Sequence, residues 1–275
     1  MDQNNSYKIK ELSEILNISK QMIRYYEQCG VIHPERSKEN NYRIYHAMDL
    51  FELLDAICLS KFDVNIKKIH EIKNSQTGEM LVESYRTFYQ KKQEEIAFDR
   101  LICERSKEMI DSIETAKLNI GNIYVKKMPE ATSHQWFYGK DDQYTKMMLP
   151  NHLLSFISSP KMIPFIDNII LFEQEKETWF VQFQNRYMQE DHIPSYETWI
   201  HKAEHLALAT VIDMGDKGAF KDHQVFAMEK KMRAKGYDLE EHIYGQLLYR
   251  GVENGSYHRY LELLIPLKHS NDCNI

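Results

Sequence analysis

The segment SKQMIRYYEQCG, from Ser19 to Gly30, has the signals of a complete short helix. Serine is a favoured N-cap, and glycine suits the position just after a helix, so the segment predicts a helix between its two ends. Met22, Ile23 and Tyr26 recur at helical spacing and are expected on the buried side of this helix.

The residues before Ser19 predict another short helix that ends close to it. Asn17-Ile18 makes a tight break between the two, and helices joined by so few residues form a helix-turn-helix. The spacing alone leaves two interpretations open, a DNA-reading motif or a helical hairpin within a core. The apolar residues that share one face of the first helix are Ile9, Leu12, Ile15 and Leu16.

The residues after Gly30 extend this domain. A polar loop over 35–41 precedes the β-prone run Tyr42–Tyr45, which predicts a hairpin wing. Apolar spacing then predicts a third helix, followed by a fourth that begins after an Asn65 cap. The apolar residues of these helices are Leu50, Leu53, Leu54 and Ile57, then Ile66, Ile69 and Ile72.

Several short motifs follow one another here in an order that resembles the MerR family of transcriptional regulators. They are IKEL at Ile9–Leu12, IRYYE at Ile23–Glu27, GVI at Gly30–Ile32, NYRIY at Asn41–Tyr45 and DL at Asp49–Leu50. The match covers roughly residues 1–73 and favours DNA binding over a buried hairpin. The segment Asp63–Asn65 departs from the family pattern at a turn and not at a DNA contact.

The second helix is the expected reader of DNA. In a winged helix-turn-helix it lies in the major groove with its N-terminal residues nearest the bases. Ser19, Lys20 and Gln21 occupy that end, where lysine and glutamine hydrogen-bond base edges and the helix N-terminus favours phosphate. The resemblance implies that Arg24 and Tyr25 contact the DNA backbone or groove.

The wing and the third helix supply the remaining expected contacts. The resemblance implies that Arg43 contacts a phosphate, and Lys61 or Ser60 is expected to add another. For Tyr42 and Tyr45 both DNA contact and core packing remain open.

The charge of the chain does not by itself indicate a nucleic-acid partner. Residues 1–74 hold 11 basic and 11 acidic groups, and the whole chain has a formal charge of −6. A single domain with so few cations on DNA is expected to bind weakly, because each neutralised phosphate adds to affinity. A homodimer is therefore expected.

The segment 78–121 is the expected dimerisation helix, because no glycine or proline lies between Gly78 and Gly121. The resemblance implies an antiparallel coiled coil between two subunits. The alternative is that the helix packs on its own chain. The residues expected to form its apolar stripe are Leu81, Tyr85, Phe88, Ile102, Met109, Ile113, Ala116 and Ile120.

Residues 122–275 are expected to form a third domain, after a DNA-binding domain over 1–77. Strand and helix patterns occur here in a doubled β-α-β-β order, with helices near 146–158 and 220–235. The expected strands that follow these helices lie near 168–173 and 178–188, and near 241–250 and 257–267. This layout and the closing segment Tyr257–Pro266 resemble the GyrI-like effector domains of multidrug-sensing MerR proteins. The overall fold class is then α+β.

Alternation along the last strands places Glu262 on a face away from the helices. Tyr260, Tyr244 and Gln246 are expected on the same side as Glu262. The resemblance gives Glu262 the role of binding a lipophilic cation, because a carboxylate among aromatic rings suits such a ligand. A solvent-exposed edge glutamate and a neutral or anionic effector are the alternatives. The aromatic residues expected to complete the cavity are Trp179, Phe183 and Tyr187.

The sequence predicts neither an enzyme nor a metal or cofactor site. Its four cysteines form no CxxC pair, and it contains no nucleophile elbow or phosphate-binding loop. It shows no membrane-spanning or secretory segment, so a cytoplasmic protein is expected. Two other functions stay open, a GyrI-like hydrolase with Glu262 as general base and a DNA-bending protein that needs no ligand.

The family resemblance implies a complete mechanism. The dimer binds double-stranded promoter DNA, and the effector changes the coiled coil so that the DNA is distorted. RNA polymerase, an indirect partner, then engages, and the protein acts as an activator.

Overall fold

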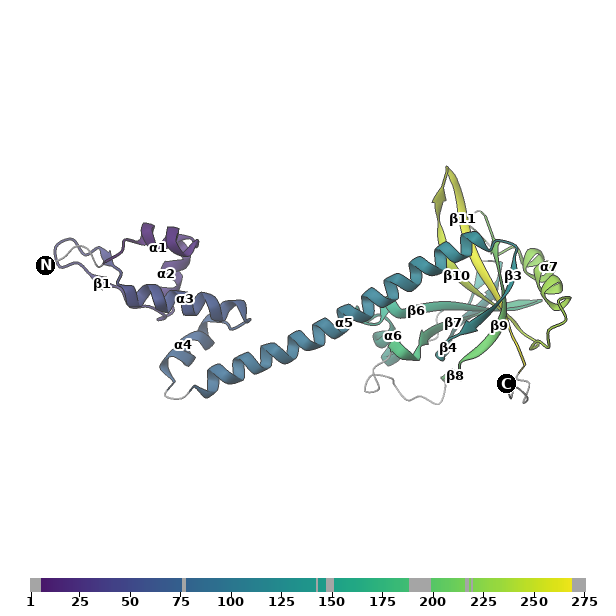
Figure 1. The fold of residues 1–275 in the computed structure, drawn as a ribbon, viewed down its shortest axis with the longest axis horizontal. Helices are drawn as coiled ribbons and strands as arrows, with labels where there is room; N and C mark the ends of the chain where they lie inside the picture. The colour runs from purple at the N-terminus through teal and green to yellow at the C-terminus, as the bar shows by residue number, and fades with distance from the viewer. Residues whose placement is uncertain are drawn as a thin grey trace. The chain divides into compact units, whose positions relative to one another are not determined.

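The computed structural model describes residues 6–75, 78–141, 143–146, 151–187, 199–215, 218 and 220–268 (Figure 1). The chain divides into two compact units, Met1–Phe98 and Asp99–Ile275. Within the described ranges, no helix is both long enough and apolar enough to cross a membrane.

The first unit contains the helices and the hairpin that the sequence indicates. Ser19 caps the second helix, since its Oγ accepts a hydrogen bond 3.1 Å long from the N–H of Met22. Asn65 caps the fourth helix through Lys68 N–H in the same way. The elements are α1 (Ile9–Leu16), α2 (Lys20–Gln28), β1 (Glu35–Arg36), β2 (Arg43–Ile44), α3 (Ala47–Lys61) and α4 (Ile66–Asn74).

The core of the first unit differs from the sequence prediction at three positions. Ile15, Met22 and Leu54 were expected to be buried, but their exposed fractions are 56%, 44% and 45%. Each lies at the edge of its helix's apolar stripe, so it turns away from the core. The buried residues are Leu12, Ile23, Tyr26, Val31, Ile32, Tyr45, Leu53, Ala56, Leu59, Val64 and Ile69.

A single helix, α5 (Glu79–Leu118), occupies most of the segment expected for dimerisation. Some of its apolar residues contact their own unit. In the first unit Tyr85 and Phe88 pack edge-on against Phe62, with ring centroids 4.9 and 5.2 Å apart. In the second unit Ala116 is buried beside Tyr260. The alternative of packing on the same chain therefore holds for part of the expected stripe.

The second unit is built on one antiparallel sheet in the order β3-β9-β11-β10-β6-β7-β4-β5, with β8 paired to β4. With the short strands β5 and β8 and the 3₁₀ turns left out, the order β4-α6-β6-β7 is followed along the chain by β9-α7-β10-β11. The long strands are β3 (Ile123–Met128), β4 (Ala131–Lys140), β6 (Ile166–Glu173), β7 (Lys176–Gln184), β9 (His205–Asp213), β10 (Ile243–Glu253) and β11 (Ser256–Pro266). The shorter elements are β5 (Gln143–Tyr144), β8 (Ile200–Lys202), α6 (Asn151–Ile157) and α7 (Asp222–Arg233), with 3₁₀ turns η1 (Ile163–Phe165) and η2 (Asn185–Tyr187).

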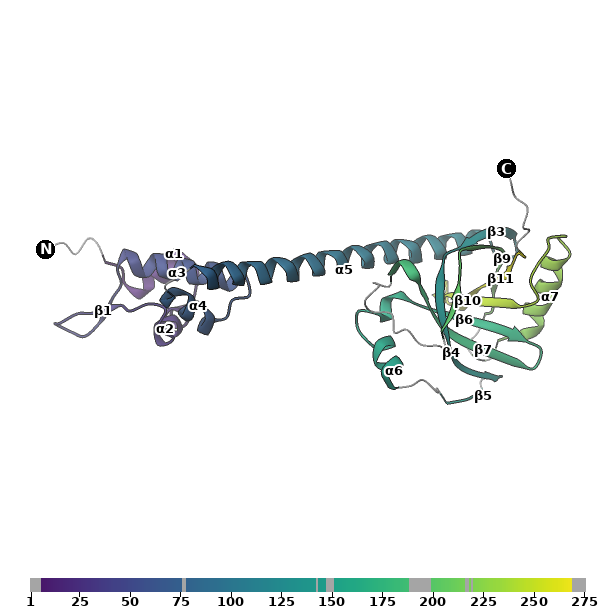
Figure 2. The ribbon, with the colours of Figure 1, turned by 90° about the horizontal axis from the view of Figure 1, so that it is seen from below.

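The two faces of this sheet carry different partners. Leu261, Leu263 and Ile265 of β11 pack with Val225 and Met232 of α7, as alternation along the strand predicts. We call this side the α7 face. The opposite side bears Glu262, and we call it the Glu262 face. The last turns of α5 lie on the Glu262 face, so α5 and α7 are on different sides of the sheet (Figures 1 and 2).

Candidate DNA-binding and effector sites

The helix α2 presents a polar surface. Lys20, Gln21, Arg24 and Tyr25 are all exposed, and their spacing of three and four residues places them together on the side away from the core. The hydroxyl of Ser19 caps the helix. The structure thus brings together the residues of α2 that the sequence suggested for DNA contact.

An ion pair that was not predicted from the sequence connects the wing to α2. Arg43 Nε donates to both carboxylate oxygens of Glu27, at 3.0 and 2.7 Å, and this bonding raises the pKa of the arginine. Arg36, from the other wing strand, lies 3.8 Å from the same carboxylate. Arg43 thus positions the wing against α2, and its expected contact with a DNA phosphate stays a prediction. The sequence signal that could have predicted this ion pair is Glu27 in α2 together with Arg36 and Arg43 in the wing.

The remaining candidate DNA contacts in the first unit differ in their exposure. Tyr45 is fully buried, so core packing holds for it. Tyr42 is 73% exposed at the wing, and its contact with DNA stays a prediction. Lys61 is exposed at the end of α3. The neighbouring Ser60 hydroxyl donates to the carbonyl of Ile57.

In the second unit, Glu262 is buried and fully engaged. Its exposed fraction is 2%, Tyr124 Oη donates to Oε1 at 2.6 Å, and Lys126 Nζ donates to Oε2 at 2.6 Å. Burial and the negative charge of Glu262 together raise the pKa of Tyr124. The solvent-exposed edge glutamate is excluded. The counter-ion of Glu262 is supplied by the protein, from β3.

The strand register decides which candidates share the Glu262 face. Gln246 lies directly opposite Glu262, and Tyr244 lies opposite Leu264. Across a ladder, paired residues point to the same side of a sheet. These two predicted neighbours of Glu262 therefore lie on its face. Tyr260 does as well, stacked on Tyr249 and beneath α5.

The aromatic residues expected to complete that cavity do not reach it. The ladder runs from Gln246 to Ile169 and on to Phe180, so Phe180 is the β7 residue on the Glu262 face. Trp179 and Phe183 alternate with it and point to the other side. There Trp179 lies 5.8 Å from Phe220 between ring centroids.

Phe183 and Tyr187 are core residues. Phe183 is fully buried against Phe156 and Trp199, and Tyr187 stacks on Phe165 with ring centroids 4.8 Å apart. Their assignment to the effector site came from alternation along one strand, which does not reveal which face meets Glu262.

A cavity of about 260 Å³ lies on the Glu262 face. One side of it is Tyr244, whose ring centroid is 3.9 Å from Lys202 Nζ. Residues from eight strands line the cavity, so the sheet itself forms most of the wall. Its apolar lining includes Leu171, Phe180, Ala207 and Leu264, and its polar lining includes Ser133, Gln182, Lys202, His205 and His242.

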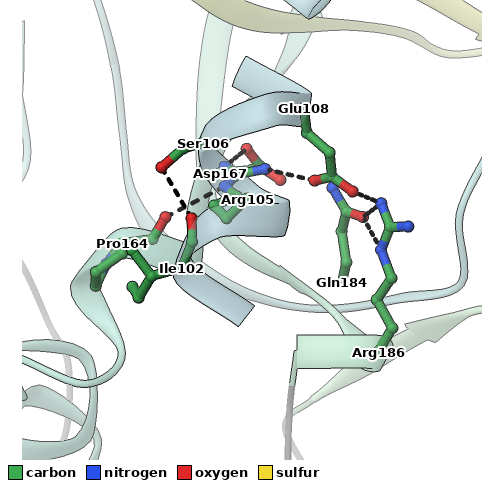
Figure 3. A network of polar contacts seen from close by, with 8 residues as sticks. All are labelled: Ile102, Arg105, Ser106, Glu108, Pro164, Asp167, Gln184 and Arg186. Atoms are coloured by element: carbon green, nitrogen blue, oxygen red, sulfur yellow. Dashed lines mark hydrogen bonds and ion pairs between the residues drawn. The ribbon is translucent and has the colours of Figure 1, made fainter. Parts of the chain in front are cut away.

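A polar network centred on the buried pair Arg105 and Asp167 connects α5 to the sheet of the second unit (Figure 3). Arg105 of α5 donates from Nη2 to Asp167 Oδ1 at 2.6 Å and from Nε to the carbonyl of Pro164 at 3.2 Å. Glu108, one turn further on, pairs with both Arg105 and Arg186. We call the residues Arg105, Glu108, Asp167 and Arg186 the anchor network.

The described residues contain no cluster of three or more histidine, cysteine or acidic side chains arranged to hold a metal ion.

Comparison with known proteins identifies the first domain. Residues 7–76 match the family model "MerR HTH family regulatory protein". No curated protein matches the chain significantly.

Two solved structures are similar to the chain at low identity. One is a transcriptional regulator of the MerR family from Bacillus cereus, with 16% identity and a TM-score of 0.33, covering 40% of this chain and 83% of that one. The other is a cryo-EM structure of an EcmrR–DNA complex in EcmrR-RPo, with 14% identity and a TM-score of 0.33, covering 96% of this chain and 100% of that one. The family match alone shows that residues 7–76 of this chain form a MerR-family helix-turn-helix domain.

Proposed function

We propose that this protein is a homodimeric transcriptional regulator whose first domain binds promoter DNA and whose last domain binds a small effector. The family match over residues 7–76 carries the proposal. The exposed set on α2 (Lys20, Gln21, Arg24 and Tyr25) supports it, because such side chains read bases and bind phosphates in the major groove.

Dimerisation is supported by a seven-residue repeat along α5. Val82, Tyr89, Ile96, Cys103 and Ile110 recur at this interval, and each is exposed within its own unit. A two-stranded coiled coil requires such a repeat, and exposed apolar side chains gain stability when a partner helix covers them. This repeat, and not the residues that pack on their own chain, is our proposed dimer contact.

The effector role is supported by the doubled β-α-β-β order of the second unit and by the cavity on the Glu262 face. Together they favour a GyrI-like effector domain. A cationic effector at Glu262 would have to replace Lys126, since that lysine already neutralises the carboxylate.

The anchor network can couple effector binding in the cavity to the position of α5. Asp167 and Ile169 stand two residues apart on β6 and so share a face; Ile169 lines the cavity while Asp167 holds Arg105 of α5. An effector that prefers one arrangement of β6 would thereby shift α5. By the family resemblance, this shift distorts the promoter and lets RNA polymerase engage, so that the protein activates transcription.

Replacement of Arg24 by alanine tests DNA binding. We expect the variant to bind the protein's own upstream region at least roughly tenfold more weakly, because one charged contact with DNA is lost in each subunit. The slope of log affinity against log salt concentration should also fall by about one per subunit. Both quantities are measured by titrating labelled DNA at several salt concentrations.

The matched control is Lys231→Ala, which removes an exposed cation from α7. It should leave affinity and salt slope unchanged. If the two variants bind alike, the exposed face of α2 is not the DNA-binding surface.

A further inference from the structure

We propose that the cavity on the Glu262 face takes a small apolar molecule bearing a carboxylate, with Lys202 as its counter-ion. The inference rests on the effector role proposed above, and it names the class of ligand. It replaces the lipophilic cation that the sequence resemblance implied.

The size and the walls of the cavity indicate a small, largely apolar ligand. Its volume of about 260 Å³ lies just below the roughly 300–1,000 Å³ usual for ligand pockets. Leu171, Phe180 and Leu264 contribute apolar surface from three different strands. A fused aromatic ring pair or a short acyl chain matches these features.

The charges at the cavity favour an anion over a cation. Lys202, His205 and His242 line it, and the described residues of the lining include no aspartate or glutamate. The nearby Glu262 does not change this balance, because Lys126 and Tyr124 occupy both of its oxygens. A bound cation would therefore lose water without gaining a counter-ion, which is costly in a partly buried site.

Lys202 lies at the cavity, where it can form an ion pair with such an anion. Its Nζ lies 3.9 Å from the ring centroid of Tyr244, and both residues line the cavity. The lysines of β3 have carboxylate partners, Lys126 with Glu262 and Lys127 with Glu204. In the part of the chain that the structure describes, Lys202 has none. A ligand carboxylate would complete a charge-assisted hydrogen bond with it, and Ser133 and Gln182 offer further polar groups.

Three probes that share one ring system test the charge preference. Naphthoate, naphthalenemethanol and naphthylmethylammonium are titrated into the full-length protein, without DNA, by isothermal calorimetry. We expect naphthoate to bind most tightly and the ammonium compound least. In Lys202→Met, which keeps the apolar stem, naphthoate should bind about tenfold more weakly and the alcohol as before.

Two further variants locate the site. Lys127→Met removes an exposed lysine of β3 and should leave naphthoate binding unchanged. Ile200 lines the cavity and is 46% exposed, so Ile200→Trp should fill part of the cavity without disturbing the core. We expect this variant to bind all three probes more weakly.

The proposal fails if the ammonium compound binds as tightly as naphthoate, or if no probe binds. It also fails if Lys202→Met resembles Lys127→Met, or if Ile200→Trp binds like the unmodified protein. None of these results affects the DNA titration of Arg24→Ala, so failure here is distinguishable from failure of the proposed regulator function.

Discussion

Replacing Ile96 with glutamate is expected to convert the proposed dimer to single subunits and to lower promoter affinity by about two orders of magnitude. Ile96 is the central member of the seven-residue repeat on α5 and is 53% exposed within its own unit. A glutamate there would be buried against the partner helix without a counter-ion, which strongly disfavours association. Once the subunits separate, each helix-turn-helix domain must bind DNA alone and the gain from two linked sites is lost. Sedimentation equilibrium and DNA titration measure the two effects.

Thr87→Glu is the matched control for this variant. It adds the same side chain at an exposed position of α5 that lies outside the repeat. We expect it to remain a dimer and to bind DNA normally. Because Ile96 contributes little to its own unit's core, both variants should keep the unmodified protein's helical circular dichroism. Dimeric Ile96→Glu would show that the repeat is not the subunit contact.

The sequence predicts the first domain well because its determinants are local. Ser19 and Asn65 cap their helices through bonds that span three residues, so residue type and position suffice to find them. The apolar face of β11 was equally accessible, because alternation along one strand places Leu261 and Leu263 together. These features need no knowledge of the rest of the fold.

The candidate effector site was harder to predict because it depends on which strands are neighbours in the sheet. Tyr124 and Lys126 lie far from Glu262 in sequence and reach it only because β3 and β11 both flank β9. The same reason explains the misplaced Trp179. Alternation identifies two faces of β7, but only the ladder through β6 and β10 shows that Phe180, not Trp179, shares a face with Glu262.

For a related reason, the sequence did not show which residues of the expected α5 stripe pack on their own chain. Phe88 and Ala116 are apolar and periodic, but they pack on Phe62 and on Tyr260 of their own chain. Apolar periodicity shows that a helix face is covered without showing what covers it. Exposure in the folded chain separates the residues that contact their own unit from the exposed ones proposed to contact a partner subunit.

Breaking the anchor network is expected to destabilise the second unit and to abolish the proposed change in promoter activity on effector binding. Arg105 and Asp167 are both less than a tenth exposed, and their side chains are 2.6 Å apart. Asp167→Ala leaves the arginine's charge buried and without this partner, and such a loss costs about 3 kcal/mol of unfolding free energy. Chemical unfolding followed by circular dichroism measures this value.

The double variant Arg105→Met with Asp167→Leu separates stability from signalling. Replacing both charges of a buried pair with well-packed apolar residues is often neutral or stabilising, so most of the lost stability should return. If the pair carries the effector signal to α5, the double variant should bind effector and DNA but show no change in promoter activity when effector is added. A normal transcriptional response in the double variant would limit the pair to a structural role, and coupling would then have to pass through the apolar contacts around Ala116.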